Sequence, residues 1–159
     1  MLDCRAHAQF PPRIERDRER PRQSVFWAKG RCEPNQERDV IIELNKTFRF
    51  EAAHLLPNVH DGHKCRRLHG HSYQIELVLV GEMDEKMGWL MDFADVRAAW
   101  QPVHDTLDHY YLNEIPGLEN PTSEVLAHWI FERLTATLPD LDAVIVHETC
   151  TSSATYRKR

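Results

Sequence analysis

The sequence lacks any apolar run close to the roughly 18 residues that a membrane-spanning helix needs, which argues against a helical membrane protein. No apolar segment lies near the N-terminus, so we expect no secretory signal and a cytoplasmic protein. The four cysteines, Cys4, Cys32, Cys65 and Cys150, show no paired spacing, and in a cytoplasmic protein they are expected to be reduced. There is also no internal repeat, and no glycine-rich loop of the kind that binds phosphate.

An excess of basic charge is missing too, because the net charge is −5. This argues against a nucleic-acid-binding protein that relies on bulk charge. The charge is uneven, since residues 1–38 hold eight Arg and one Lys against six acidic residues, a sum of +3, and four of the nine prolines. The other 121 residues hold 11 basic and 19 acidic side chains, a sum of −8. We predict a disordered extension at 1–38 before a single domain at 39–159, the alternative being a basic arm that docks on a partner.

What the sequence does contain is a series of alternating and helical apolar patterns. Alternation predicts strands at 47–54, 69–81 and 143–150, with 40–44 leading into the first and a fourth strand at 154–158. The strand at 69–81 is partly apolar on both faces, which indicates that helices or other subunits cover both.

Two helices are expected between the second and third strands. The first follows Asp92 as N-cap and carries an apolar stripe to Leu107, and Pro102 can kink it. The second starts after Asn120 or Thr122 and continues to Leu138, with Pro139 as its stop. The element order predicts an α+β fold: an antiparallel four-stranded sheet with two helices packed on one face.

Three histidines are the strongest candidates for metal ligands. His69 and His71 are two residues apart, so on a strand both rings point to one face, and a hairpin would bring His54 to the same place. Three neutral imidazoles with one open position are typical of a catalytic zinc site. Cys65 either supplies a thiolate beside the metal, closes the site as a fourth ligand, or is an inert buried thiol.

Other polar residues are weaker candidates. Asp108 and His109 form a carboxylate–imidazole pair suited to proton transfer, although adjacent Asp and His often form a plain surface pair. Glu148 shares an apolar strand face with Val144 and Val146, where a carboxylate needs a partner. The guanidine-like edge of a ligand or an Arg side chain could be the partner of this carboxylate.

Several short motifs follow one another between about residues 46 and 157. They are Phe50-Glu51-Ala52-Ala53-His54, Gly62-His63-Lys64-Cys65, Leu68-His69-Gly70-His71, Gly88-Trp89 with Met91-Asp92-Phe93, Leu107-Asp108-His109 with Tyr111-Leu112-Asn113, Ile115 to Glu124, and Glu148-Thr149-Cys150-Thr151. Taken together, these motifs resemble the 6-pyruvoyl-tetrahydropterin synthase superfamily, and in particular its 6-carboxy-5,6,7,8-tetrahydropterin synthase branch. Only three residues separate Cys65 from His69, which is similar to that branch; the 6-pyruvoyl enzymes usually have a longer insertion, and a folate-linked branch usually has Glu in place of Cys65.

The resemblance implies a tunnelling fold whose subunits join into barrels, commonly as hexamers, with active sites between subunits. It implies conversion of 7,8-dihydroneopterin triphosphate to 6-carboxy-5,6,7,8-tetrahydropterin, acetaldehyde and triphosphate, a step of queuosine and 7-deazaguanine synthesis. The implied roles are one zinc ion per chain on His54, His69 and His71; proton transfer by Cys65, Asp108 and His109; and pterin binding by Glu148, Thr122 and Ser123.

Three alternatives to this function stay open at this point. One is the sister activity of 6-pyruvoyl-tetrahydropterin synthase, a triphosphate lyase. Another is a structural zinc module closed by Cys65, and the last is a relative that binds zinc or pterin without turnover.

Overall fold

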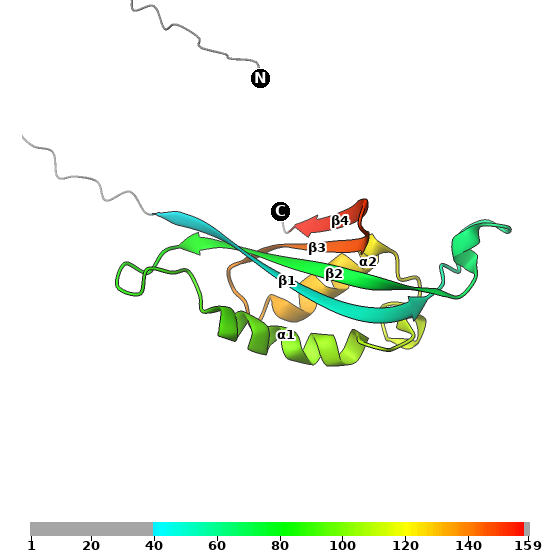
Figure 1. The fold of residues 1–159 in the computed structure, drawn as a ribbon, viewed down its shortest axis with the longest axis horizontal. Helices are drawn as coiled ribbons and strands as arrows, with labels where there is room; N and C mark the ends of the chain where they lie inside the picture. The colour runs from blue at the N-terminus through cyan, green and yellow to red at the C-terminus, as the bar shows by residue number, and fades with distance from the viewer. Residues whose placement is uncertain (1–39, 158–159) are drawn as a thin grey trace, which may run out of the picture. The chain divides into compact units, whose positions relative to one another are not determined.

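The structure is a computed structural model that describes residues 40–157. The predicted extension at 1–38 and its boundary at 39 lie outside the described residues and stay predictions. Within the described part the chain forms one sheet, two α-helices and two short 3₁₀ helices (Figure 1). The elements are β1 (Ile41–His54), η1 (Lys64–Arg66), β2 (His69–Glu82), α1 (Phe93–Leu107), η2 (Leu112–Glu114), α2 (Ser123–Leu134), β3 (Leu141–Thr149) and β4 (Ser152–Arg157).

The sheet is antiparallel throughout, with strand order β1-β2-β3-β4. This confirms the predicted four-stranded sheet. β1 is longer than the predicted strand at 47–54, because its register with β2 runs without a break from Ile41 to His54. β4 likewise begins at Ser152, two residues before its predicted start.

Both helices pack on the same face of the sheet, as predicted (Figure 1). Alternation along β1 and β2 directs every second side chain to this face, and the helices bury their apolar stripes against it. Full burial of one such aliphatic or aromatic side chain stabilises the fold by roughly 1.5–3 kcal/mol. The core includes Phe50, Tyr73, Ile75, Leu77 and Leu79 from the sheet, and Val96, Trp100, Leu107, Leu126 and Ile130 from the helices.

The first helix begins as the sequence indicates. Asp92 is its N-cap, and the carboxylate accepts a hydrogen bond of 2.8 Å from the Ala94 N–H. Pro102 lies inside the helix, which continues to Leu107. No helix among residues 40–157 is long and apolar enough to cross a membrane.

The second helix has the predicted start but ends earlier. Thr122 is the N-cap, and its hydroxyl accepts a hydrogen bond from the Val125 N–H. The predicted end at Leu138 is wrong by four residues, because α2 ends at Leu134. The N–H groups of Thr137 and Leu138 both donate to the Leu134 carbonyl, which tightens the chain into a turn. Leu138 is still buried, so the apolar pattern at this position indicates burial and not a continuing helix.

Candidate metal centre and active site

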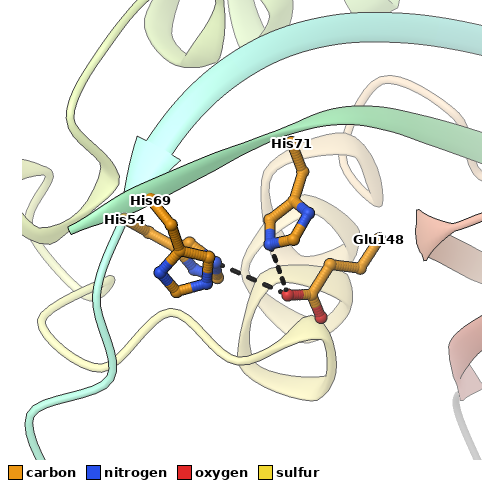
Figure 2. A group of neighbouring side chains, drawn as sticks. All are labelled: His54, His69, His71 and Glu148. Atoms are coloured by element: carbon orange, nitrogen blue, oxygen red, sulfur yellow. Dashed lines mark ion pairs between the residues drawn. The ribbon is translucent and has the colours of Figure 1, made fainter. Parts of the chain in front are cut away.

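Four side chains able to bind a metal ion meet at one end of the sheet, on the face that the helices cover (Figure 2). His54 ends β1, His69 and His71 begin β2, and Glu148 lies near the end of β3. His54 lies directly opposite His69 in the antiparallel register, so their side chains share one face. One ligand atom from each of the four residues lies within 4.8 Å of the others.

Two of the three imidazole rings are held by backbone carbonyls. His54 Nδ1 lies 3.0 Å from the Pro121 carbonyl oxygen, and His69 Nδ1 lies 2.7 Å from that of Arg67. A carbonyl can only accept, so each Nδ1 carries the hydrogen and each Nε2 is left with its lone pair. The buried Tyr73 hydroxyl, 3.2 Å from His54 Nδ1, gives the first ring a second contact. Metal-binding histidines in proteins are commonly fixed in this way.

The three histidine Nε2 atoms are suited to bind a metal ion. The Nε2 atoms of His54, His69 and His71 are buried, and no described residue gives them a hydrogen-bond partner. An unsatisfied buried polar group costs about 1–3 kcal/mol, and a metal ion would satisfy all three at once. Burial is the main influence that lowers the pKa of His71; the charge of Glu148 opposes it, and His54 and His69 act with it. The neutral ring that results is the form that binds metals.

Glu148 lies among the histidines. Its Oε1 is 2.9 Å from His71 Nε2 and 3.5 Å from His54 Nε2 (Figure 2). The Ser123 hydroxyl donates a hydrogen bond of 2.7 Å to Oε2. The contact with His54 is the largest influence on the pKa of Glu148; burial opposes it, and Ser123 and the His71 and His54 charges act with it, lowering the pKa to about 2. The carboxylate is therefore charged at neutral pH.

Sequence reasoning did not predict this position of Glu148. It expected the carboxylate to face a ligand or an Arg, whereas the structure places it beside two of the three histidines. A usable signal was present, because Glu148 shares its strand face with the buried Val144 and Val146. The register of β2 with β3 was also needed, and no local pattern gives it.

Cys65 lies in η1, next to the metal-binding group but not part of it. Its half-buried side chain lines a hollow of about 660 Å³, together with His69, His71 and Glu148. Lys64 and Arg67 line the same hollow. Because the thiol borders the hollow without belonging to the metal-binding group, it is placed to act on a molecule bound in that hollow.

Asp108 and His109 form a close pair at the end of α1. His109 Nδ1 lies 2.9 Å from Asp108 Oδ2, and Asp108 Oδ1 accepts a hydrogen bond of 2.9 Å from the Glu51 N–H. That backbone hydrogen bond, followed by the one from His109, holds the pKa of Asp108 below its usual value. His109 has a left-handed backbone with φ 63°, fixed by its own N–H bonding to the Glu51 carbonyl. The exposed His109 ring is thus held in one direction by β1.

The structure does not bring Cys65 and His109 into one hollow of a single chain. His109 lines a separate hollow of about 550 Å³, with Glu51, Gly70 and Tyr111 among its other residues. His71 borders both hollows. Within residues 40–157, Cys65 and His109 therefore line different hollows, and His71 is a border residue of both.

Thr122 and Ser123 lie at the start of α2 and border a smaller hollow of about 280 Å³ beside Glu148. The Thr122 hydroxyl caps the helix and the Ser123 hydroxyl bonds to Glu148. The two loop histidines, His60 and His63, contact each other and take no part in the metal-binding group.

Comparisons with known proteins identify the family to which the chain belongs. The 6-carboxy-5,6,7,8-tetrahydropterin synthase of Synechocystis sp. is 50% identical over 119 residues, which are 71% of this chain and 91% of the relative. The protein of the same name from Bacillus subtilis is 31% identical over 79% of this chain and 92% of its own. The solved 6-pyruvoyl tetrahydropterin synthase of Caenorhabditis elegans superposes with a TM-score of 0.71 at 29% identity, covering 77% of this chain and 99% of that one. Residues 43–159 match the family described as 6-pyruvoyl tetrahydropterin synthase, and the chain belongs to this family of pterin enzymes.

Proposed function

We propose that this chain is a zinc-dependent lyase that converts 7,8-dihydroneopterin triphosphate to 6-carboxy-5,6,7,8-tetrahydropterin, acetaldehyde and triphosphate. One water is consumed, because triphosphate leaves and the bond between the first two side-chain carbons is then hydrolysed. The observation that carries the proposal is the set of three buried Nε2 atoms that adjoins the hollow of Cys65 and has no hydrogen-bond partner within residues 40–157. The names of the relatives from Synechocystis and Bacillus support this product.

In this proposal His54, His69 and His71 hold one zinc ion per chain. Neutral imidazole nitrogens suit the tetrahedral preference of zinc, and three protein ligands leave a position for substrate. When bound, the zinc ion supplies a Lewis acid that lowers the pKa of the substrate's side-chain hydroxyls.

Cys65, as a thiolate, takes a proton from the substrate side chain. Lys64 and Arg67 border the same hollow, where their positive charges can bind the triphosphate. His109 transfers a proton on the other side of the pterin, and the Asp108 carboxylate fixes its ring through the 2.9 Å contact.

Glu148 anchors the pterin by accepting hydrogen bonds from its 2-amino group and ring N–H. A charged carboxylate that accepts two parallel hydrogen bonds from a guanidine-like edge gives both strength and orientation. Thr122 and Ser123 border the hollow next to this carboxylate and are assigned to the wall of the pterin pocket.

The working enzyme is proposed to be an oligomer, with a hexamer favoured, whose active sites lie between subunits. Cys65 and His109 line separate hollows of one chain, so a site that uses both needs a second copy. In the described part, β1 and β4 each have one edge without a partner strand, which leaves room for sheets of neighbouring copies to join into a barrel. We place this enzyme in the cytoplasm, in the queuosine and 7-deazaguanine pathway.

The second candidate is a 6-pyruvoyl-tetrahydropterin synthase, the name carried by the superposable Caenorhabditis elegans protein. Incubating purified protein with 7,8-dihydroneopterin triphosphate and identifying the products by mass distinguishes the two. Acetaldehyde together with the 6-carboxy product is the expected result. Accumulation of 6-pyruvoyl-tetrahydropterin as the sole end product would assign the sister activity instead.

A further inference from the structure

Cys65 lies in the connection between β1 and β2, which projects beyond the ends of the two strands (Figure 1). The Cys65 N–H donates a hydrogen bond of 3.1 Å to His63 Nδ1, so the side chain of His63 is the N-cap of η1. Ser, Thr, Asp or Asn usually accept at such a position, through a side-chain oxygen. Here the acceptor is an imidazole nitrogen, on a histidine that takes no part in the metal-binding group.

This hydrogen bond fixes which nitrogen of the His63 ring carries the hydrogen. An N–H group can only donate, so Nδ1 must keep its lone pair, and the one hydrogen of the neutral ring lies on Nε2. His54 and His69 have the opposite arrangement, because each Nδ1 donates to a backbone carbonyl. The His63 ring therefore presents an acceptor to Cys65 and offers a metal ion no lone pair on its other nitrogen.

The backbone of Cys65 is held at its second polar group too. The Cys65 carbonyl accepts a hydrogen bond of 2.8 Å from the N–H of Leu56, which follows closely after the metal-binding His54. With the N–H and the carbonyl both bound, the direction of the Cα–Cβ bond is set, and the thiol can move only among the staggered rotamers of χ1. Of these two attachments, only the one from His63 uses a side chain, so substitution can remove it by itself.

The loop before η1 supports the His63 ring. The edge of this ring contacts the His60 ring, with centroids 5.4 Å apart, and the His63 N–H donates to the His60 carbonyl at 3.2 Å. Arg66, at the end of η1, donates to the carbonyls of Pro57 and Val59 at 3.2 and 2.9 Å. The loop and η1 are thus joined on both sides of the capping hydrogen bond.

We propose that His63 is a positioning residue, whose Nδ1 acceptor holds the backbone of Cys65 so that the thiol borders the substrate hollow in one place. This inference rests on the proposed function for the role of Cys65 as a base. His63 itself is not among the residues that line the hollow of Cys65. Proton transfer requires the two heavy atoms to approach within about 2.6–3.2 Å. A displacement of about 1 Å can lower the rate about 100-fold while substrate binding is kept.

Two substitutions separate the acceptor atom from the ring. His63→Phe keeps a ring beside His60 and removes the acceptor, whereas His63→Asn removes the ring and keeps an acceptor at the same number of bonds from the backbone. In full-length protein we expect His63→Phe to lower kcat about tenfold or more, with KM within about threefold and zinc content unchanged. His63→Asn should keep kcat within about threefold of wild type. His128→Phe, the same substitution at an exposed histidine of α2, is the matched control and should change none of these values.

A residue that only stabilised the loop would give a different result. It would lower the fraction of folded protein, which circular dichroism and zinc analysis report, and leave kcat per folded, zinc-loaded chain unchanged. A kcat of His63→Phe within twofold of wild type on that basis would overturn the proposal. So would a His63→Asn variant as slow as His63→Phe, because the acceptor atom would then not be the feature that matters.

Hydrogen exchange of the Cys65 amide, measured by NMR, tests the same contact without turnover. We expect this amide to exchange about tenfold or more faster in His63→Phe than in wild type, and within about threefold of wild type in His63→Asn. The Ala94 amide, which donates to Asp92 at the start of α1, is the internal control and should stay unchanged. Equal protection of the Cys65 amide in His63→Phe and wild type would show that His63 does not hold Cys65. Protection as expected, together with a wild-type protein that forms no pterin product, would refute the proposed function and leave the attachment of Cys65 to His63 established.

Discussion

At the scale of single residues, the metal centre depends on which ring nitrogen of each histidine carries a hydrogen. The Pro121 and Arg67 carbonyls fix this for His54 and His69 before any ion binds. Ligand atoms that already lie within 4.8 Å of one another reduce the ordering that metal binding requires. The centre should therefore be sensitive to the loss of a ring and much less so to surface changes.

The first prediction concerns these rings. His71→Ala, or His69→Ala, should weaken zinc binding about 100-fold or more and abolish turnover. Loss of a residue that only hydrogen-bonds to a metal ligand already lowers metal affinity or activity about 10–100-fold, and these variants lose the ligand itself. Zinc content by mass spectrometry and product formation provide the readout. His128→Ala, on the exposed face of α2, is the matched control and should keep both. Full zinc occupancy in the double variant would refute the assignment of these ligands.

The second prediction concerns Cys65. Cys65→Ala should keep zinc and substrate binding but lose product formation, because the base is removed while the four metal-binding side chains remain. Calorimetric titration with substrate and zinc analysis separate these effects, and Cys150→Ala, at an exposed thiol, is the control. Loss of zinc from Cys65→Ala would instead favour a structural site closed by this thiol.

At the scale of elements, the end of α1 is tied to β1 through Glu51. Its N–H donates to the Asp108 carboxylate and its carbonyl accepts from the His109 N–H. This two-way contact positions the Asp108–His109 pair on the sheet and not merely on a loop. The Asp108 carboxylate is therefore as much a connection between elements as a partner of His109.

The third prediction follows from the lowered pKa of Asp108. A carboxylate whose pKa is lower in the folded than in the unfolded state stabilises the fold above its unfolded value of about 3.9. That contribution is lost as the pH falls through the lower, folded pKa. Asp108→Asn should thus be less stable than wild type from pH 5 to 7, and the difference should shrink below about pH 4.

Urea unfolding of the metal-free proteins across this pH range checks the third prediction. Asp61→Asn is the matched control, because that side chain is almost fully exposed, and it should show no such pH dependence. A stability difference between Asp108→Asn and wild type that grows on acidification would contradict the assigned sign.

How much could be predicted from sequence depended on the distance over which each contact acts. Period-two alternation and one hairpin sufficed to gather His54, His69 and His71, because antiparallel neighbours share a face. The position of Glu148 needed the pairing of β2 with β3, and an irregularity near the end of β3 shifts that region. That Cys65 and His109 line separate hollows could not be predicted, because both residues lie in connecting segments between strands and helices. These segments are held by hydrogen bonds to backbone groups far away in the sequence, and composition does not reveal such contacts.

At the scale of the whole molecule, the separate hollows of Cys65 and His109 predict that two inactive variants can restore each other. In a mixed oligomer of Cys65→Ala and His109→Ala chains, a site built from two subunits combines both intact residues in about a quarter of cases. We therefore expect about a quarter of wild-type activity after coexpression and purification through two different tags. Each variant alone should be inactive, and the absence of recovery in mixed oligomers would place the whole site within one chain.

The last prediction concerns residues 1–38, whose net charge of +3 is opposite in sign to the −8 of the remaining 121 residues. A chain that starts at Asp39 keeps every proposed ligand, base and pterin contact, and the matched family region begins only at residue 43. Roughly 120 residues suffice for one core. We expect this truncated chain to fold, bind zinc and keep kcat/KM within about threefold, which is under about 1 kcal/mol of transition-state stabilisation.

The competing hypothesis is that the arginine-rich segment steers the triphosphate towards the site. Steering would give the full-length enzyme a kcat/KM that falls with added salt, while the truncated enzyme would lack that dependence, since salt screens exposed charges beyond about 10 Å at 0.1 M. Steady-state rates of both proteins over a salt series separate the two ideas. Because a small anionic substrate and a net-negative domain repel each other, any steering by the extension must exceed that repulsion. Equal salt slopes would therefore assign the extension no part in catalysis, and a truncated chain that aggregates would make it part of the folded enzyme.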